Sequence, residues 1–379
     1  MSHPEELDRL NEEITSHMGH LNKSFIKVLS LYAFGMIMLR HCGQTQIAVF
    51  LSGLCECKYG SMKQRLRELT YEAQAKCGSQ RHELEVSSCF TPLLSWVLSC
   101  MNTSHKQVVL AFDATYLSDR FIILAVSVVV CGTAIPVAWH IRKATDKGKW
   151  NPIWKQLFAD LSPAIASGWQ VFVLSDSGLY SKPLFNYLAK KKWAVMMRIS
   201  GGQGLFRPLG RCKWVPLRRL VKRGMTPRIL SGHCFKGNPL RCQLILQWED
   251  QYESPCLIVT NLPTSKIQHN TYTIRYWIEC GFKDFKRGLF HWEQTKMTCP
   301  KRAERLWLVM SISMFWLTTI GDTALASPHW YSLAQARPDS RILSAPVLGW
   351  IELFLSLLQQ RPIQHRQLQL YPWLPLPDT

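Results

Sequence analysis

The stretch Val108–Asp113, VVLAFD, decides the fold, because a short apolar run that ends in an acid is typical of a buried strand. Gln170–Asp176, QVFVLSD, repeats this pattern further along the chain. Between them, Phe121–Val130 is rich in β-branched residues, and Ala134–Ile141 follows a Cys-Gly-Thr turn as the returning strand of a hairpin. These runs predict a sheet that begins with three strands consecutive in the chain.

Helical and strand patterns alternate after the hairpin. We expect helices over Trp150–Ile165 and Lys182–Lys192, and a strand over Ala194–Ile199. The resulting order, β-β-β-α-β-α-β, predicts an α/β fold with a mixed sheet and helices packed on it. A further core strand is expected at Cys256–Thr260, and later helices at Thr271–Arg287, Arg302–Ile320 and Ala345–Leu358.

The expected helix over Thr271–Arg287 carries a Y-x2-R-x3-E-x6-K motif made by Tyr272, Arg275, Glu279 and Lys286. At 100° per residue, the last three positions lie at about 300°, 340° and 320° from the first, and Lys283 lies at about 20°. An α-helix would therefore place one acid among phosphate-binding groups on a single face. Ordinary i,i+4 ion pairs, worth about 0.3 to 0.5 kcal/mol each, explain the charges but not the tyrosine.

Three acids are candidate metal ligands: Asp113 and Asp176 at strand ends, and Glu279 on the later helix. Carboxylate oxygens are the ligands that Mg²⁺ prefers. Two ions held about 4 Å apart can activate an attacking oxygen and stabilise a leaving one during phosphoryl displacement. Each strand-end acid alone is weak evidence, because acids also cap helices. Together with the helical motif, they predict a two-magnesium site.

The composition favours a polyanionic partner. The chain has 379 residues, 47% hydrophobic content and a formal charge of +19, enough to bury a core and extreme for this size. From Ser177 to Trp248 the sequence contains fifteen Lys and Arg residues and no acid. Nucleic acid is the first candidate partner, an anionic membrane surface the second, and simple solubility by charge the bland alternative.

Cysteine usage and apolar stretches limit the class of protein further. Thirteen cysteines occur without a C-x2-C pair, and the amino terminus is acidic and polar, so we expect reduced thiols inside a cell. A zinc site would need Cys212, His233, Cys234 and Cys242, whose spacing matches no standard pattern. Phe121–Trp139 and Leu306–Ile320 approach membrane-spanning length, but both are better explained as buried core.

These residues and spacings resemble bacterial insertion-sequence transposases of the DDE class, specifically the family numbered four, whose hallmark is the Y-R-E-K spacing. The resemblance covers roughly residues 105 to 325. It implies a ribonuclease H-like core interrupted by a β-rich insertion, and cut-and-paste DNA transposition through a hairpin intermediate. The sequence departs from the family pattern at two places. Ala114-Thr115 follows the first acid where relatives often have a second acid, and Ser177-Gly178 follows Asp176 where an arginine is common.

The resemblance also implies roles for individual residues. Asp113, Asp176 and Glu279 would bind two Mg²⁺ ions, which Mn²⁺ can replace, and Tyr272, Arg275, Lys283 and Lys286 would bind phosphates near the cleaved end. A flipped base would stack on a tryptophan of the insertion. Trp248 is the first candidate and Trp214 the second, although either could simply be a core residue.

The expected domain organisation follows from the same patterns. Ser61–Leu69 could contact DNA, although an ordinary basic helix explains it equally well. The predicted domains are a helical DNA-end-binding domain at 1–104, a ribonuclease H-like core at 105–199 and 256–330, a basic β-rich insertion at 200–255, and a carboxy-terminal helix with a Pro-rich tail at 331–379 that is a candidate for dimerisation.

The expected partners are double-stranded DNA, as terminal inverted repeats and as target, and a second copy of the chain, without a membrane. The expected location is the bacterial cytoplasm, on the nucleoid. Two alternatives stay open: a ribonuclease H-like nuclease without strand transfer, and a domesticated DNA-binding protein that keeps only the fold.

Overall fold

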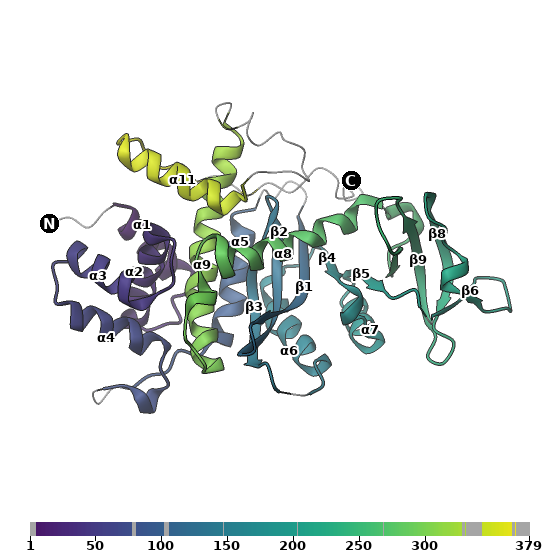
Figure 1. The fold of residues 1–379 in the computed structure, drawn as a ribbon, viewed down its shortest axis with the longest axis horizontal. Helices are drawn as coiled ribbons and strands as arrows, with labels where there is room; N and C mark the ends of the chain where they lie inside the picture. Colours follow the sequence, from purple (N-terminus) through teal and green to yellow (C-terminus); the bar gives the residue numbers. More distant parts are fainter. Residues whose placement is uncertain are drawn as a thin grey trace.

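A ten-stranded mixed sheet runs from the middle of the computed structural model to the end opposite the amino-terminal helices (Figure 1). The described residues are 5–77, 81–101, 106–146, 148–202, 204–267, 269–327, 330, 343–365 and 368. The strand order is β3-β2-β1-β4-β5-β10-β9-β8-β6-β7. The sheet is therefore built from segments that lie far apart in the sequence.

The first five strands form the half of the sheet for which we expected a ribonuclease H-like core. They are β1 (Gln107–Leu117), β2 (Phe121–Val130), β3 (Thr133–Lys143), β4 (Gln170–Ser175) and β5 (Ala194–Ile199). β1, β2 and β3 pair antiparallel, whereas β4 pairs parallel with both β1 and β5. Every residue of β2 is buried, as expected for a strand covered on both faces. The predicted order of elements and the mixed α/β fold are confirmed.

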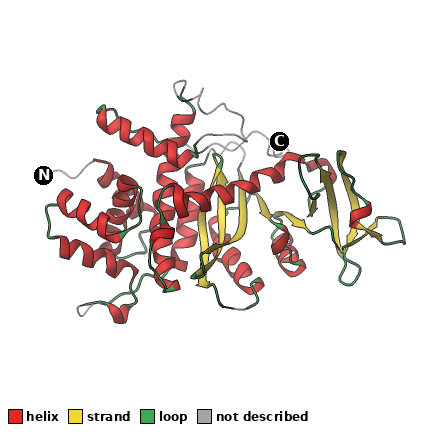
Figure 2. Cartoon of the chain, in the orientation of Figure 1, coloured by secondary structure: helices red, strands yellow, loops and turns green. Residues whose placement is uncertain are grey.

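Helices cover both faces of this half, as Figure 2 shows. They are α6 (Asn151–Leu161), α7 (Lys182–Lys190), α8 (Trp277–Lys283) and α9 (Pro300–Leu325). Phe112 on β1 packs edge-on against Trp154 of α6. Because neighbouring residues of a strand point to opposite faces, Asp113 points to the other face, toward the segment that carries α8.

The basic segment from 200 to 255 adds strands to the same sheet. Its strands are β6 (Leu205–Pro208), β7 (Val215–Pro216), β8 (Met225–Cys234) and β9 (Leu240–Trp248). β9 pairs with β10 (Cys256–Thr260), and β10 pairs antiparallel with β5. In β8 most residues are half-buried or exposed, so this end of the sheet is less covered than its centre.

The amino-terminal part is helical, as predicted. Its α-helices are α1 (Glu5–His17), α2 (Lys23–Leu39), α3 (Gln44–Leu54), α4 (Tyr59–Thr70) and α5 (Phe90–Ser99). Asn22 caps α2 by accepting a hydrogen bond from the Phe25 amide. Buried Arg305 of α9 donates hydrogen bonds to the carbonyl oxygens of Thr70 and Leu84 and pairs with Glu83, which fixes these helices to the core.

Helix α11 (Ala345–Leu358) crosses α9 at very close range. A β-carbon on Gly321 would lie 1.9 Å from the Ala345 carbonyl oxygen, and one on Gly349 would lie 1.9 Å from that of Leu317. Glycine is therefore required at both positions of this crossing. Most of the Pro-rich tail beyond Arg361 lies outside the described residues.

Both apolar stretches of near membrane-spanning length are buried, as predicted: one forms β2 with most of β3, and the other lies within α9. Among the described residues, α9 has the length and composition of a membrane span, and 89% of its apolar window is buried inside the protein. Helices α2 and α3 meet the same criteria only as a pair, which is bent by 103°.

Two details of the sequence prediction were wrong. β1 does not end at Asp113 but continues to Leu117, because β2 pairs with it over its whole second half. The segment 271–287 is not one α-helix: a 3₁₀ helix (His269–Tyr276) leads into α8, which continues as a π-helix (Asp284–Gly288). The helix type therefore changes twice along the motif. Tyr272, Arg275 and Lys286 nevertheless all contact residues of the sheet.

Candidate active site

Asp113 lies at the level of the sheet where β4 ends. The parallel pairing of β1 with β4 runs up to Phe112 opposite Ser175, so Asp113 is the first residue of β1 beyond it. Asp176 is the first residue after β4. The two aspartates therefore lie at the carboxyl ends of two neighbouring parallel segments, although only the second one ends its strand.

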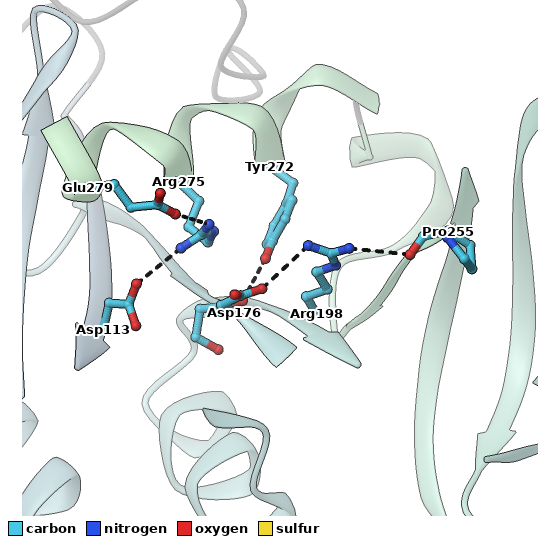
Figure 3. A network of polar contacts seen from close by, with 8 residues as sticks. Asp113, Asp176, Arg198, Pro255, Tyr272, Arg275 and Glu279 are labelled. Atoms are coloured by element: carbon cyan, nitrogen blue, oxygen red, sulfur yellow. Dashed lines mark hydrogen bonds and ion pairs between the residues drawn. The ribbon is translucent and has the colours of Figure 1, made fainter. Parts of the chain in front are cut away.

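Glu279 reaches this place from α8. Gly281 lets α8 lie directly on β3, because a β-carbon there would be 2.4 Å from the carbonyl oxygen of Ala134. Figure 3 shows Asp113, Asp176 and Glu279 around the side chain of Arg275. The structure thus brings all three predicted acids to one site.

Arg275 connects two of the acids directly. Its Nη1 donates to Asp113 Oδ2 at 3.2 Å, and its Nη2 donates to Glu279 Oε1 at 2.6 Å. The Arg275 side chain is 10% exposed, whereas that of Glu279 is 46% exposed. The predicted ion pair between Arg275 and Glu279 therefore exists, but the arginine is buried and also holds Asp113.

The third acid is held by an arginine that the sequence argument missed. Arg198 Nη1 lies 3.6 Å from Asp176 Oδ1, an ion pair without a hydrogen bond. Arg198 lies in β5, where every other residue is buried and apolar. A lone charge in such a strand needs a partner, and this signal could have identified it.

The electrostatics of Asp113 reflect the convergence of the acids. Burial raises the pKa of its carboxyl from 3.8 to about 6. The amide of Ala114 and the guanidinium of Arg275 lower this pKa, while the negative charges of Asp176 and Glu279 raise it. The contributions of Asp176 and Glu279 show that the three carboxyl groups lie near enough to interact electrostatically.

The other residues of the motif occupy different positions around the acids. Tyr272 is buried and donates its hydroxyl hydrogen to the Ser175 carbonyl at 2.8 Å, so it braces the end of β4. Lys286 Nζ donates to Thr115 Oγ1 at 2.7 Å, just beyond Asp113. Lys283 is exposed, and in the described part of the chain it makes no hydrogen bond or ion pair with the three acids.

A pocket of about 350 Å³ lies beside Asp176, between β5 and the insertion. Arg198, Arg218 and Trp248 are among its lining residues. The Trp248 indole donates to the Tyr252 carbonyl at 3.0 Å, which orients the ring. Trp214, the second candidate, instead packs under Arg207 at 5.1 Å and does not line this pocket.

The acids suit a divalent cation by their chemistry but are not preassembled as a closed ligand set. Within the described ranges, no three His, Cys, Asp or Glu side chains lie close enough to form a metal site as they stand. This applies to Cys234, Cys242 and His233 as well as to the acids. Asp176 Oδ1 is nevertheless buried and accepts no hydrogen bond. This carboxylate oxygen is therefore available as a ligand for a divalent cation such as Mg²⁺.

Comparison with known proteins agrees with this geometry. The family profile described as transposase DDE domain matches residues 124–316, just over half of the chain. The match contains Asp176 and Glu279. Asp113 lies before its start, on β1, which pairs with β2. A search of curated proteins finds none that matches the chain.

Two solved structures are distantly similar. One is the cryo-EM structure of the piggyBac transposase synaptic complex with hairpin DNA, with 12% identity, a TM-score of 0.38, and coverage of 93% of this chain and 79% of that chain. The other is the crystal structure of the Mos1 strand transfer complex, with 16% identity, a TM-score of 0.19, and coverage of 40% and 52%. Both are too distant to assign any residue.

The profile match alone covers enough of the chain to identify its family. That family generally uses a divalent metal to cleave DNA. The chain belongs to the transposases with a DDE domain, enzymes that cleave DNA and transfer its strands.

Proposed function

We propose that this chain is the transposase of an insertion sequence of the Y-R-E-K family, which moves its element by cut-and-paste transposition through a hairpin at each end. The observation that carries the proposal is the meeting of Asp113, Asp176 and Glu279 at one edge of the sheet, with Arg275 between two of them. A protein that only binds DNA has no need for three converging acids.

Asp113, Asp176 and Glu279 are the residues that would hold two Mg²⁺ ions, with Mn²⁺ as a substitute. The bound metal supplies charge stabilisation at the attacking and leaving oxygens of the phosphodiester. The chain's own contribution is to fix the acids. Tyr272 holds the end of β4 through the Ser175 carbonyl, and Gly281 lets α8 approach the sheet.

DNA phosphates near the cleaved end would contact the cations that surround the acids. Lys286 and Arg198 lie on two sides of the site, beside Thr115 and Asp176. Burial lowers the pKa of Lys286, so a phosphate partner would favour its charged form. Lys283 is exposed on the same segment and free to turn toward DNA. Tyr272 would support the end of β4 and would not contact DNA, because its hydroxyl already donates to the Ser175 carbonyl.

The pocket beside Asp176 is our candidate for an unstacked base. Its volume of about 350 Å³ is sufficient for a nucleobase, and it combines an indole with two guanidinium groups. Stacking of a base on an aromatic ring is worth about 1 to 3 kcal/mol. Trp248 is therefore preferred over Trp214 as the stacking residue.

Recognition of the terminal repeat is assigned to the amino-terminal helices. α3 and α4 are joined by a four-residue turn, Cys55–Lys58, and α4 buries Met62, Leu66 and Leu69 on one side. Tyr59, Gly60 and Ser61 at its start are exposed. This resembles the helix-turn-helix arrangement in which the start of the second helix meets base edges.

The wider assembly is also a proposal. Two ends must be joined in one complex, so we propose a homodimer on DNA, with the basic insertion contacting DNA backbone. The carboxy-terminal helix α11 exposes Leu357 and Leu358 and is the candidate for the dimer contact. The enzyme would work in the bacterial cytoplasm, on the nucleoid.

A cleavage and strand-transfer assay tests the proposal. The substrates are duplexes taken from the DNA that flanks the chain's own gene, incubated with supercoiled target plasmid and Mg²⁺. We expect hairpin-ended fragments and joined products from the wild-type chain and neither from Glu279→Gln. Nicking without joining, across repeated flanking sequences, would instead support a nuclease.

A further inference from the structure

Arg275 lies between Asp113 and Glu279, two of the acids that would have to bind the metal ions together. It is 8% exposed as a whole residue, and its guanidinium spans from Asp113 on β1 to Glu279 on α8. A planar guanidinium presents several donors in a fixed fork, so it can hold two carboxylates at once. In Figure 3 it is the group that links these two elements.

Arg275 holds one oxygen of each of two candidate metal ligands, Asp113 Oδ2 and Glu279 Oε1. Mg²⁺ takes oxygen ligands at about 2.0 to 2.1 Å and requires near-octahedral geometry. An ion bound by these two carboxylates would therefore compete with the guanidinium for their oxygens. The Glu279 side chain is 46% exposed and can turn away from it more easily than the Asp113 side chain, which is 19% exposed.

We propose that Arg275 is an internal placeholder for the metal. In the metal-free protein it neutralises and aligns Asp113 and Glu279, and it releases them when the ions bind. The released guanidinium then becomes available to a DNA phosphate beside the site. This inference rests on the proposed function, because it requires the two acids to be metal ligands.

The exchange of partners makes two bindings depend on each other. A metal ion that displaces Arg275 raises the affinity for DNA, and DNA that binds Arg275 raises the affinity for metal by the same factor. Neither effect is expected if Arg275 keeps its carboxylates throughout. The coupling therefore distinguishes a placeholder from a permanent structural ion pair.

Calorimetric titration of DNA-free protein with Mn²⁺ is the first test. We expect Arg275→Gln to bind Mn²⁺ about tenfold more tightly than the wild type, because the competing charged hydrogen bonds are gone. Arg287→Gln is the matched control: Arg287 is 73% exposed in its side chain and pairs with Glu293, so the same charge is lost without touching the acids. Its Mn²⁺ affinity should equal that of the wild type.

Equal or weaker Mn²⁺ binding by a folded Arg275→Gln protein would overturn the placeholder and show that the arginine only supports the site. If that variant does not fold, Arg275→Lys serves instead, because one ammonium group cannot reproduce the fork. It should also bind Mn²⁺ more tightly than the wild type. The proposed function fails separately, if Asp113→Asn and Glu279→Gln leave Mn²⁺ binding unchanged.

Binding of a short duplex, measured with and without Ca²⁺, is the second test. The wild-type chain should gain about fivefold in DNA affinity when Ca²⁺ is present, within the usual range for coupled sites. Arg275→Gln should gain less, while Arg287→Gln should gain as much as the wild type. An equal gain in all three proteins would contradict the release of Arg275 toward DNA.

Discussion

Strands β2 and β8 belong to one sheet, yet every residue of β2 is buried whereas β8 is mostly half-buried or exposed. β2 lies between helices on both faces, and β8 lies in the basic insertion (Figure 1). The buried half holds all three acids of the site. The exposed half has no acid from β6 to β9 and many cations. One sheet therefore combines a buried half that positions the acids with an exposed, cationic half that we propose to contact DNA.

Loss of one acid in the buried half should have the largest effect. Glu279→Gln keeps the shape of the side chain but removes a charged ligand. We expect cleavage of plasmid DNA in Mg²⁺ to fall about a thousandfold, since metal stabilisation of the transition state is worth several kcal/mol. DNA affinity by gel shift without divalent ions should stay within about twofold, because one carboxylate contributes little to phosphate binding. A loss of DNA binding that parallels the loss of cleavage would contradict the separation of these two roles between the halves of the sheet.

Packing in the two halves should tolerate a methyl group very differently. Gly281→Ala places a β-carbon against the Ala134 carbonyl oxygen, so we expect the free energy of unfolding to fall by about 2 kcal/mol. Gly237→Ala is the control in the insertion, because nothing lies within 4 Å of its β-carbon position. Urea unfolding should show a change below about 0.5 kcal/mol there. An equal loss of unfolding free energy in the two variants would contradict the difference in packing between the two halves.

Buried acids should make the stability of the core depend on pH. Burial raises the pKa of Asp284 in the π-helix from 3.8 to about 6. Its contribution to stability is therefore complete below about pH 3.8 and is lost as the pH rises through about 6.

We expect Asp284→Asn to be more stable than the wild type by about 2 kcal/mol near pH 8, because the variant has no charge to bury. The two proteins should differ little near pH 4. Urea melts at both pH values measure this. A constant difference between the proteins at the two pH values would mean that ionisation of Asp284 is not its cause.

Charges of the exposed half should have the smallest effects, seen in the salt dependence of binding. Arg228 and Arg241 lie on β8 and β9, and both are exposed. If each contacts a phosphate, its replacement by Gln should reduce the slope of log affinity against log salt by about one. Unfolding free energy should stay unchanged. An unaltered slope in the double variant would exclude this face as a DNA contact.

The sequence predicted the strands of the core well, for a local reason. Asp113 and Asp176 follow short apolar runs that are typical of buried strands. The segment around Arg275 was predicted less well. The sequence pattern predicted one α-helix, whereas the segment changes from 3₁₀ helix to α-helix and then to π-helix, and Lys283 is exposed on it.

Ion pairs between residues far apart in the sequence were the other feature that the sequence patterns could not predict. The bond between Arg275 and Asp113 joins residues 162 positions apart, and no spacing rule encodes it. Arg198 beside Asp176 was missed for the same reason, although a charge inside the apolar run of β5 was a usable warning. Sequence patterns identified which residues carry charge, and the fold decided which charges meet.

Anomalous scattering from crystals soaked in Mn²⁺ tests the central claim most directly. The account predicts manganese peaks within coordination distance of carboxylate oxygens from Asp113, Asp176 and Glu279, with the Arg275 guanidinium moved away from Asp113. Manganese bound elsewhere, with Arg275 still joining Asp113 to Glu279, would contradict it.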